Sequence, residues 1–357
     1  MAWQTSKDGR LERLVAFATV EGAAVPIGEL TFEGRSRRVS TFRYARSWLQ
    51  RPGSWPVAPI GLPLRAKATS SLALEVPLPL YDAMPDGWGK EVLVRAFPNQ
   101  VFGAGEFLAA AGDDRVGDLR FGPSPDGPVQ WEPDHPMLAV PDGEEGLEAL
   151  QAAAEAIDEG RETVTHLHLL YRNSADLGGA RPKTRLRRPD GSRWIAKFRA
   201  QGDAFDYPRI EAACLTAARA SGVNVPDHEV VEVAGRGVLL VRRFDRVGEA
   251  GRLGYMSAAT LMGTDTTAYA TSTSYAEIAA KAREIGVVPC EGELFRRLLV
   301  NCLLHNTDDH LRNHAFLRTG QTWCLSPAFD IVPCRTPRLV VRPAPKIDPL
   351  SELHNSR

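Results

Sequence analysis

The chain has 357 residues, of which 43% are hydrophobic and 24% are charged, and its formal net charge is −1. One compact core seldom holds this many residues, so the length predicts two or three packed units with the composition of an ordinary soluble protein. The near-zero charge excludes proteins that coat nucleic acid or an anionic membrane through their overall charge.

The lack of a recognisable targeting signal and the spacing of the cysteines both favour the cytoplasm. No apolar run approaches the roughly 18 residues that span a bilayer, and residues 1–8 contain no apolar segment of the signal-peptide type. The five cysteines form no C-x-x-C pair, which favours reduced thiols over a disulfide framework or a thiolate zinc site. We therefore expect a cytoplasmic protein with no membrane association.

The first unit, residues 1–121, is predicted to be rich in β-structure. Short runs separated by Gly and Pro predict strands at Leu14–Val20 and Glu29–Gly34. Trp88–Phe97 is predicted to be a helix, because a Pro-Asp-Gly start signal precedes it. A turn that leads into a strand is expected over residues 113–121.

Residues 122–146 are dense in Pro, Asp and Gly and predict a linker or an extended covering segment at a domain boundary. The alanine-rich run Leu147–Ile157 predicts the helix that opens the second unit. Beyond it the sequence predicts a hairpin of Thr184–Arg188 and Trp194–Phe198, and then a helix at Pro208–Ser221 that is followed by Gly222. Two further strands are predicted around residues 235–237, and the second of them ends in Leu239–Phe244. From about Met256 onward we expect mostly helix.

A glycine loop lies at Asp176–Lys183. Gly178 and Gly179 would let the backbone approach phosphate groups, and Arg181 and Lys183 add positive charge beside them. Taken alone, a glycine pair beside a hairpin is more often a tight turn than a phosphate cradle.

Lys197 follows Ile195-Ala196, eighteen residues after Gly179. This arrangement is similar to the strand lysine of protein kinases, which holds the phosphates of the nucleotide and pairs with a helix glutamate. Glu211, on the next predicted helix, is the candidate partner. The alternative is an ordinary surface lysine and an ordinary surface glutamate.

Asp308 and Asn313 stand five residues apart, the spacing of the catalytic loop of protein kinases. Phosphoryl transfer to a hydroxyl needs a carboxylate that accepts the proton and an amide oxygen that holds a magnesium ion. A second carboxylate must bridge metal and phosphates, and Asp330 follows seventeen residues after Asn313 in Phe-Asp-Ile, where kinases have Asp-Phe-Gly. The sequence therefore predicts a phosphoryl-transfer site.

Two other interpretations of this segment stay open. On a helix, His310 and His314 would share a face and could bind a metal together with Asp308 in a hydrolytic site. No glutamate of an H-E-x-x-H motif accompanies them. The segment could also be a simple surface loop. The order of glycine loop, lysine, glutamate, Asp-x₄-Asn and aspartate favours the kinase.

These motifs together resemble the HipA family of toxin kinases, the catalytic partners in bacterial toxin–antitoxin modules. The likeness covers roughly residues 10–333, and its segments are residues 84–90, 116–119, 178–183, 241–246, 307–313 and 326–330. It implies an α+β protein with a β-rich N-terminal subdomain and a protein-kinase-like domain of two lobes. The small lobe would contain both strands and helices, and the large lobe would be helical. The expected divisions are the subdomain at 1–121, a linker at 122–146, the small lobe at 147–247, the large lobe at 248–333 and an atypical tail at 334–357.

By the same resemblance, Asp308 is the catalytic base, assisted by Asn313, while Asn313 and Asp330 bind Mg²⁺. Residues 242–244 would form the hinge against adenine, with Asp245 near the ribose. The residues implied for ATP are Gly178, Gly179, Lys183, Lys197, Arg242, Phe244, Asp245 and His310.

The resemblance implies a serine/threonine kinase that phosphorylates a cellular protein, typically a component of translation such as an aminoacyl-tRNA synthetase. It also implies neutralisation by a helix-turn-helix antitoxin of the HipB type, through which alone the complex would contact DNA. That division of labour would account for a near-neutral kinase chain.

The chain departs from the family at two places. Asp176 occupies the position of a serine whose autophosphorylation switches members off, and Ser174 lies two residues away. We expect that switch to be absent or altered. Residues 334–357 do not resemble the helices that complete the large lobe, which predicts exposed apolar surface between Leu294 and Leu304. A truncated homologue that binds nucleotide or antitoxin without turnover is therefore the second functional hypothesis.

Overall fold

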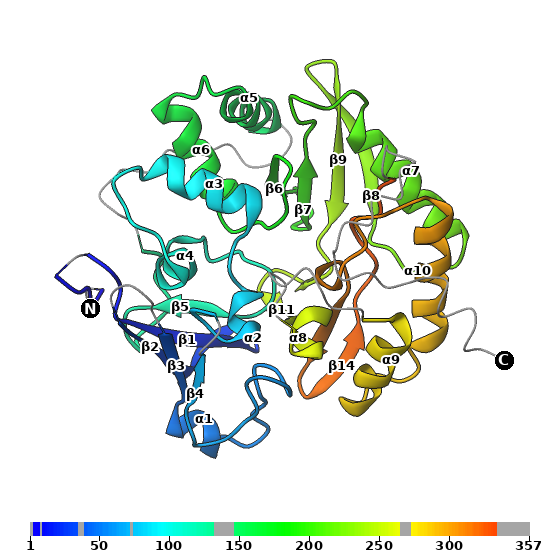
Figure 1. The fold of residues 1–357 in the computed structure, drawn as a ribbon. Helices are drawn as coiled ribbons and strands as arrows, with labels where there is room; N and C mark the ends of the chain where they lie inside the picture. The colour runs from blue at the N-terminus through cyan, green and yellow to red at the C-terminus, as the bar shows by residue number, and fades with distance from the viewer. Residues whose placement is uncertain are drawn as a thin grey trace.

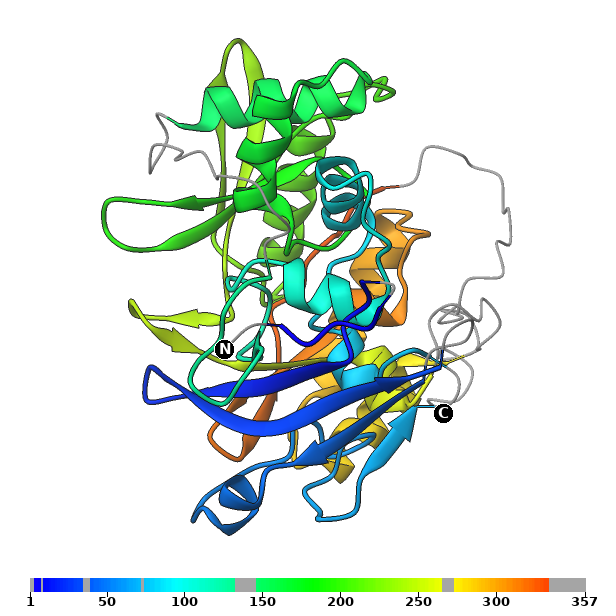
Figure 2. The same cartoon turned by 90° about the vertical axis from the view of Figure 1, so that its left-hand side faces the viewer.

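The computed structural model describes residues 3–7, 9–34, 39–71, 74–131, 146–264 and 273–333. The fold is mixed α+β, as expected, and its elements pack around separate hydrophobic clusters. The N-terminal sheet lies at one end of the molecule and the small-lobe sheet with its helices at the other, as both views show (Figure 1 and Figure 2). The predicted tail at 334–357 lies outside the described residues.

The N-terminal subdomain is built on a five-stranded antiparallel sheet of order β4-β3-β2-β1-β5. Six consecutive residues of β1 are buried, so both faces of the sheet are covered at this strand. The two strands predicted here are present. The strands are β1 (Arg13–Val20), β2 (Ala23–Glu33), β3 (Val39–Tyr44), β4 (Thr69–Ser71) and β5 (Arg120–Gly122), and the helices beside them are α1 (Arg46–Gln50), α2 (Leu78–Tyr81) and α4 (Ala104–Ala110).

The described part of the Pro- and Gly-rich segment after β5 packs back onto the N-terminal subdomain. The amide of Val129 donates to the carbonyl of Phe121 (3.1 Å), and that of Trp131 donates to the carbonyl of Ala109 (2.9 Å). The Trp131 ring packs against the subdomain core. Residues 123–131 therefore form a covering segment, and residues 132–145 lie outside the described part.

The small lobe contains a four-stranded antiparallel sheet of order β6-β7-β9-β8. Side chains alternate across β9: Val238 and Leu240 face α3, α5 and α6, whereas Leu239 and Val241 face α7. The hairpin and the two helices predicted here are confirmed within a few residues. The elements are β6 (Lys183–Arg187), β7 (Arg193–Lys197), β8 (His228–Val233), β9 (Arg236–Arg242), α3 (Gly87–Ala96), α5 (Leu147–Asp158), α6 (Val164–Ser174) and α7 (Tyr207–Ala220).

Helix α3 precedes β5 in sequence but belongs to the small-lobe packing. Trp88 and Val92 are buried in the same cluster as Trp194 and Ala196 of β7. The helix thus connects the N-terminal subdomain to the sheet that carries Lys197, and its first turn reaches the glycine loop.

The large lobe combines helices with a three-stranded sheet of order β12-β13-β14. The prediction of mostly helix after Met256 is wrong for this sheet, because the buried run of β13 is only four residues long and such a run has no periodicity that distinguishes strand from helix. The elements are α8 (Ala258–Met262), α9 (Tyr275–Glu284), α10 (Glu291–Leu303), the 3₁₀ turn η2 (Leu311–Asn313), β12 (Gly254–Ser257), β13 (Ala315–Thr319) and β14 (Thr322–Leu325), with the ribbon β10 (Arg246–Val247) and β11 (Gly251–Arg252) beside them.

Candidate active site

Three charged side chains from different elements converge on one point. Lys197 at the end of β7 places its Nζ 2.6 Å from Oε1 of Glu211 on α7. The same ammonium group forms a second ion pair with Oδ1 of Asp330, in the segment after β14. The structure thus brings together three residues that the sequence predicted separately.

Charge balance determines the protonation of this cluster. Burial would lower the pKa of Lys197, but the carboxylates of Asp330 and Glu211 outweigh it and raise that pKa. Burial likewise opposes ionisation of Asp330, yet the lysines hold its pKa below the usual value. For Glu211, burial and the nearby Asp330 prevail over Lys197 and raise the pKa. Lys197 is therefore a cation at neutral pH, positioned between the two lobes.

Asp330 occupies a constrained position. Its φ is 55°, which non-glycine residues adopt rarely. The preceding segment is fixed from two sides, because the Ala328 amide donates to the Asn224 carbonyl (2.7 Å) and Arg297 Nη2 donates to the Ser326 carbonyl (2.5 Å). This anchoring holds the Asp330 carboxylate towards Lys197 in an unfavourable backbone conformation.

The side chain of Lys183, at the end of the glycine loop, bonds to the backbone of the same loop. Lys183 donates from Nζ to the carbonyl of Gly178 at 2.6 Å, and Gly179 has a φ of 87° that favours glycine. Burial and the charge of Lys197 lower the pKa of Lys183. Two lysines of adjacent strands, paired in register, therefore face the same region as Asp330.

The segment after α10 carries Asp308 and Asn313. Asn313 Nδ2 donates to the backbone carbonyl of Asp308 at 2.9 Å, and its amide N–H donates to the carbonyl of His310 at 2.8 Å in a 3₁₀ turn. Asp308 is exposed to solvent, so a substrate hydroxyl could approach its carboxylate. The bond to Asp308 fixes the amide nitrogen of Asn313, and its oxygen accepts no hydrogen bond from the residues that the structure describes.

A buried network that sequence reasoning missed supports this loop. Tyr275 of α9 donates its hydroxyl to Asp309 Oδ2 (2.6 Å), and His314 Nε2 lies 2.9 Å from Asp309 Oδ1. Asn301 donates to the Tyr275 hydroxyl (3.0 Å) and accepts from Asn306 Nδ2 (3.1 Å). The sequence contained one sign of this network: a second aspartate, Asp309, directly follows Asp308 and has no role in the Asp-x₄-Asn motif.

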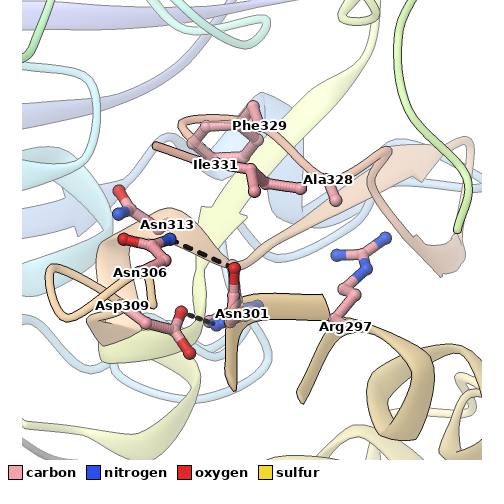
Figure 3. A pocket seen from close by; sticks show the side chains of 9 residues that line it. Arg297, Asn301, Asn306, Asp309, Asn313, Ala328, Phe329 and Ile331 are labelled. Carbon is pink, nitrogen blue, oxygen red and sulfur yellow. Dashed lines mark hydrogen bonds and ion pairs between the residues drawn. The ribbon is translucent and has the colours of Figure 1, made fainter. Parts of the chain in front are cut away.

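The network borders a small polar pocket behind the loop (Figure 3). In the figure the bond between Asn306 and Asn301 lies below Phe329 and Ile331 and above Asp309. The pocket is lined by Arg297, Asn301, Asn306, Asp309, Asn313, His314, Ala328, Phe329 and Ile331. Asn313 and the two neighbours of Asp330 in sequence, Phe329 and Ile331, therefore line the same pocket.

The residues expected at the adenine and ribose have different environments. Phe244 lies against Phe329, with ring centroids 5.6 Å apart, beside the Asp330 segment. Arg242 has an exposed side chain and pairs with Asp227 at 3.3 Å.

Asp245 is 3% exposed, and its carboxylate accepts from Arg243 Nη2 (2.9 Å), Arg246 Nη1 (2.6 Å) and the Gly117 amide (2.9 Å). This enclosure disfavours the predicted contact with ribose and gives Asp245 a structural role at the junction with the N-terminal subdomain.

The histidines do not form the helical pair that a hydrolytic metal site requires. His310 and His314 flank a 3₁₀ turn, and His314 is already bonded to Asp309. Within the part of the chain that the structure describes, no group of three or more His, Cys, Asp or Glu side chains is arranged to hold a metal ion. His310 lies close enough to Asp330 to interact electrostatically with that carboxylate.

At the expected switch position, Asp176 is buried and lies 3.1 Å from Nη1 of Arg185. Ser174 is completely buried, and its Oγ has no hydrogen-bond partner among the described residues. In this conformation neither residue is accessible to a phosphate donor.

The oxygen atoms of Asp330 and Asn313 are of the hard type that Mg²⁺ prefers. The other side of the site suits phosphate groups, because Lys197 and Lys183 supply positive charge there beside the backbone of the glycine loop. The donor set therefore matches a magnesium–nucleotide complex and could act in phosphoryl transfer.

Family models match most of the chain. The model of the HipA N-terminal domain matches residues 19–122, and that of the HipA-like C-terminal domain matches residues 175–348. No curated protein matches the chain. None of the helices of the described residues is long and apolar enough to cross a membrane.

Among solved structures, the chain is similar to that of the toxin–antitoxin system of Shewanella oneidensis MR-1, a complex of HipA, HipB and operator DNA. The TM-score is 0.65 at 19% identity, and the match covers 90% of this chain and 76% of the other. This likeness shows a shared fold. A proinflammatory kinase of Helicobacter pylori, CtkA, matches 43% of this chain and 55% of its own, with a TM-score of 0.36 and 17% identity, which is too partial to support an argument.

Proposed function

The chain belongs to the HipA family of toxins, and we propose that it is an ATP-dependent serine/threonine protein kinase. The observation that carries the proposal is the pairing of Lys197 with both Glu211 and Asp330. In protein kinases the strand lysine, the helix glutamate and the metal-binding aspartate must be in place together.

Each residue has a defined task in this reaction. Lys197 and Lys183 bind the phosphate oxygens, and the backbone of the glycine loop at Gly178 approaches them. Glu211 keeps the Lys197 side chain directed into the site. Mg²⁺, which Asn313 and Asp330 would hold, supplies charge neutralisation at the phosphates when bound.

The step itself involves one bond formed and one broken. The hydroxyl oxygen of a serine or threonine bonds to the γ-phosphorus while the bond from that phosphorus to the β–γ bridging oxygen breaks, and ADP leaves. The proton of the hydroxyl passes to the Asp308 carboxylate. Lys197 and Lys183 stabilise the charge that builds up on the phosphate oxygens.

We further propose that the kinase acts as the toxin of a toxin–antitoxin module in the cytoplasm. The cellular substrate would be a protein of translation, such as an aminoacyl-tRNA synthetase. The partner would be a helix-turn-helix antitoxin of the HipB type, as in the Shewanella complex, where HipA is bound with HipB and operator DNA. Contact with DNA would come only through that antitoxin.

A second candidate function has one observation in its favour. Helix α10 has an exposed apolar face, with Leu303 84% and Phe295 48% exposed, in the region where the sequence predicted uncovered surface. A large lobe left open there could bind nucleotide or antitoxin without turnover. Leu294 and Leu298 of the same helix are nevertheless buried, so the helix retains its own core contacts.

Radiolabelled ATP with purified protein tests the proposal. The wild type should transfer label to itself or to a generic basic protein, and Asp308→Ala should bind ATP but transfer none. Asp190→Ala, in the exposed turn between β6 and β7, is the matched control and should keep wild-type transfer. ATP binding by the wild type without transfer would favour the second candidate.

Stoichiometric zinc in protein purified without added metal would instead support the hydrolytic alternative, which the geometry around His310 and His314 disfavours.

A further inference from the structure

Asp86, at the start of α3, lies between the glycine loop and the loop that carries Asp308. We infer that Asp86 is a positioning residue, which fixes the distance between these two loops and so makes phosphoryl transfer depend on the N-terminal subdomain. The inference deepens the proposed function and rests on it for its catalytic consequence. The clamp itself can be tested without turnover.

The first contact joins Asp86 to the glycine loop. The amide N–H of Gly179 donates to Oδ1 of Asp86. The neighbouring amide of Trp88 donates to the carbonyl of Gly179 at 2.9 Å, and the indole Nε1 of Trp88 donates to the carbonyl of Lys183 at 3.1 Å. The first turn of α3 therefore holds the loop through its backbone, in the middle at Gly179 and at its end at Lys183.

This approach is close enough to require glycine. A Cβ on Gly87 would lie 2.6 Å from the carbonyl oxygen of Gly179, and Gly87 has a φ of 39°. A Cβ on Gly89 would collide with the carbonyl oxygen of Leu177. The Pro-Asp-Gly-Trp-Gly segment is thus shaped to receive the loop backbone.

The second contact joins Asp86 to the catalytic loop. Its other oxygen, Oδ2, lies 2.7 Å from Nη2 of Arg312, and the two side chains are 26% and 25% exposed. Arg312 directly precedes Asn313 in the 3₁₀ turn, and its guanidinium also lies over the Tyr81 ring, 5.6 Å from the centroid. Movement of Arg312 would therefore displace Asn313.

The helix itself does not use the Asp86 carboxylate. An aspartate at an N-cap position ordinarily accepts a hydrogen bond from a backbone N–H in the first turn of its own helix. Asp86 occupies the N-cap of α3 but makes no such side-chain bond. Both of its oxygens instead contact the loops, one each, which is the arrangement expected of a clamp.

Hydrogen exchange measured by mass spectrometry tests the clamp. Asp86→Ala removes both contacts, so amide exchange should rise at least several-fold in segments 176–183 and 306–313. Asp86→Asn can still accept from Gly179 but presents an amide to Arg312, so exchange should rise mainly in 306–313, as in Arg312→Gln. The matched control is Glu91→Gln, an exposed residue of α3 that pairs with Arg95, and both segments should exchange as in the wild type.

Transfer kinetics test the positioning role. We expect kcat to fall roughly 10- to 100-fold in Asp86→Ala, with weaker ATP binding, whereas Arg312→Gln should lower kcat and leave ATP affinity within about threefold. Unchanged exchange in both segments of Asp86→Ala would overturn the clamp, and so would increased exchange confined to segment 176–183 in Asp86→Asn. Wild-type kinetics in Asp86→Ala, with faster exchange, would overturn the positioning role.

If Asp86→Ala does not fold, Asp86→Asn and Arg312→Gln decide the matter by the same two measurements. If the wild type transfers no phosphate, the proposed function fails while the exchange data still decide whether Asp86 clamps the loops.

Discussion

Lys197 and Asp330 form an ion pair across 133 residues of sequence, and they belong to different lobes. The pair means that the charge at the end of β7 and the charge on the segment after β14 depend on each other. Any change to one residue should therefore alter the electrostatics of the other.

Replacing Asp330 by Asn should separate binding from chemistry. Without the carboxylate, Lys197 keeps Glu211 as its partner, so the protein should fold, but magnesium should no longer strengthen ATP binding. Transfer should fall by roughly 10²–10³-fold, the usual effect of removing one preorganised charge from a transition state. Titration calorimetry of ATP at several magnesium concentrations checks this. The same magnesium dependence in Asp330→Asn and wild type would show that Asp330 is not a metal ligand.

Glu211→Gln should weaken nucleotide binding without weakening the fold. Burial and Asp330 raise the pKa of Glu211, so its charged form is unfavourable in the folded state. A neutral side chain of the same shape should therefore leave the thermal midpoint of unfolding unchanged or raise it. The loss of one Lys197 partner should weaken ATP binding by about tenfold, or about 1.4 kcal/mol. A large fall in the midpoint would contradict this account.

The sequence was sufficient for the charged centre of the site. Lys197, Glu211 and Asp330 could be predicted because the reaction demands those residue types in that order, and a local hairpin and helix place two of them. The α3 boundary was equally accessible from its Pro-Asp-Gly start. The hairpin, the helix and the start of α3 could be predicted because each is determined by residues that are close together in the sequence.

What the sequence could not provide was the choice of partner over long distances. Asp86 has the features of a helix-start residue, and nothing local indicates that its carboxylate contacts Gly179, 93 residues away. Asp245 likewise matches a motif for the ribose, but tertiary packing surrounds it with arginines. Strand β13 is missed for a related reason, because its pairing with β12 and not its composition makes it a strand.

The buried network behind the proposed catalytic loop should be important for both stability and rate. Asp309→Asn replaces the carboxylate that Tyr275 and His314 contact by a neutral amide, and weakening hydrogen bonds to a buried charged group should cost about 2 kcal/mol of unfolding free energy. Tyr275→Phe removes one hydroxyl that contacts Asp309 and Asn301 and should cost about 1 kcal/mol. Urea unfolding measures both.

Because Asp309 adjoins Asp308, Asp309→Asn should also lower kcat more than it raises the KM for ATP. Equal costs for the two substitutions would indicate that the His314 pair contributes little.

Asp245 should make the protein sensitive to acid. Burial opposes its ionisation, but Arg243 and Arg246 outweigh burial and lower its pKa from 3.8 to about 2. A lowered pKa stabilises the folded state above the pKa of the unfolded chain, and this contribution disappears as the pH falls from about 4 to about 2. The shift corresponds to about 2 kcal/mol. Asp245→Asn should therefore lower the free energy of unfolding near pH 7 and flatten its dependence on pH below about 5.

Urea unfolding at a series of pH values measures this effect of Asp245→Asn. Glu249→Gln, in the exposed β10–β11 turn, is the control that should follow the wild type. The same steep loss in Asp245→Asn as in the wild type would place the acid sensitivity at other carboxylates.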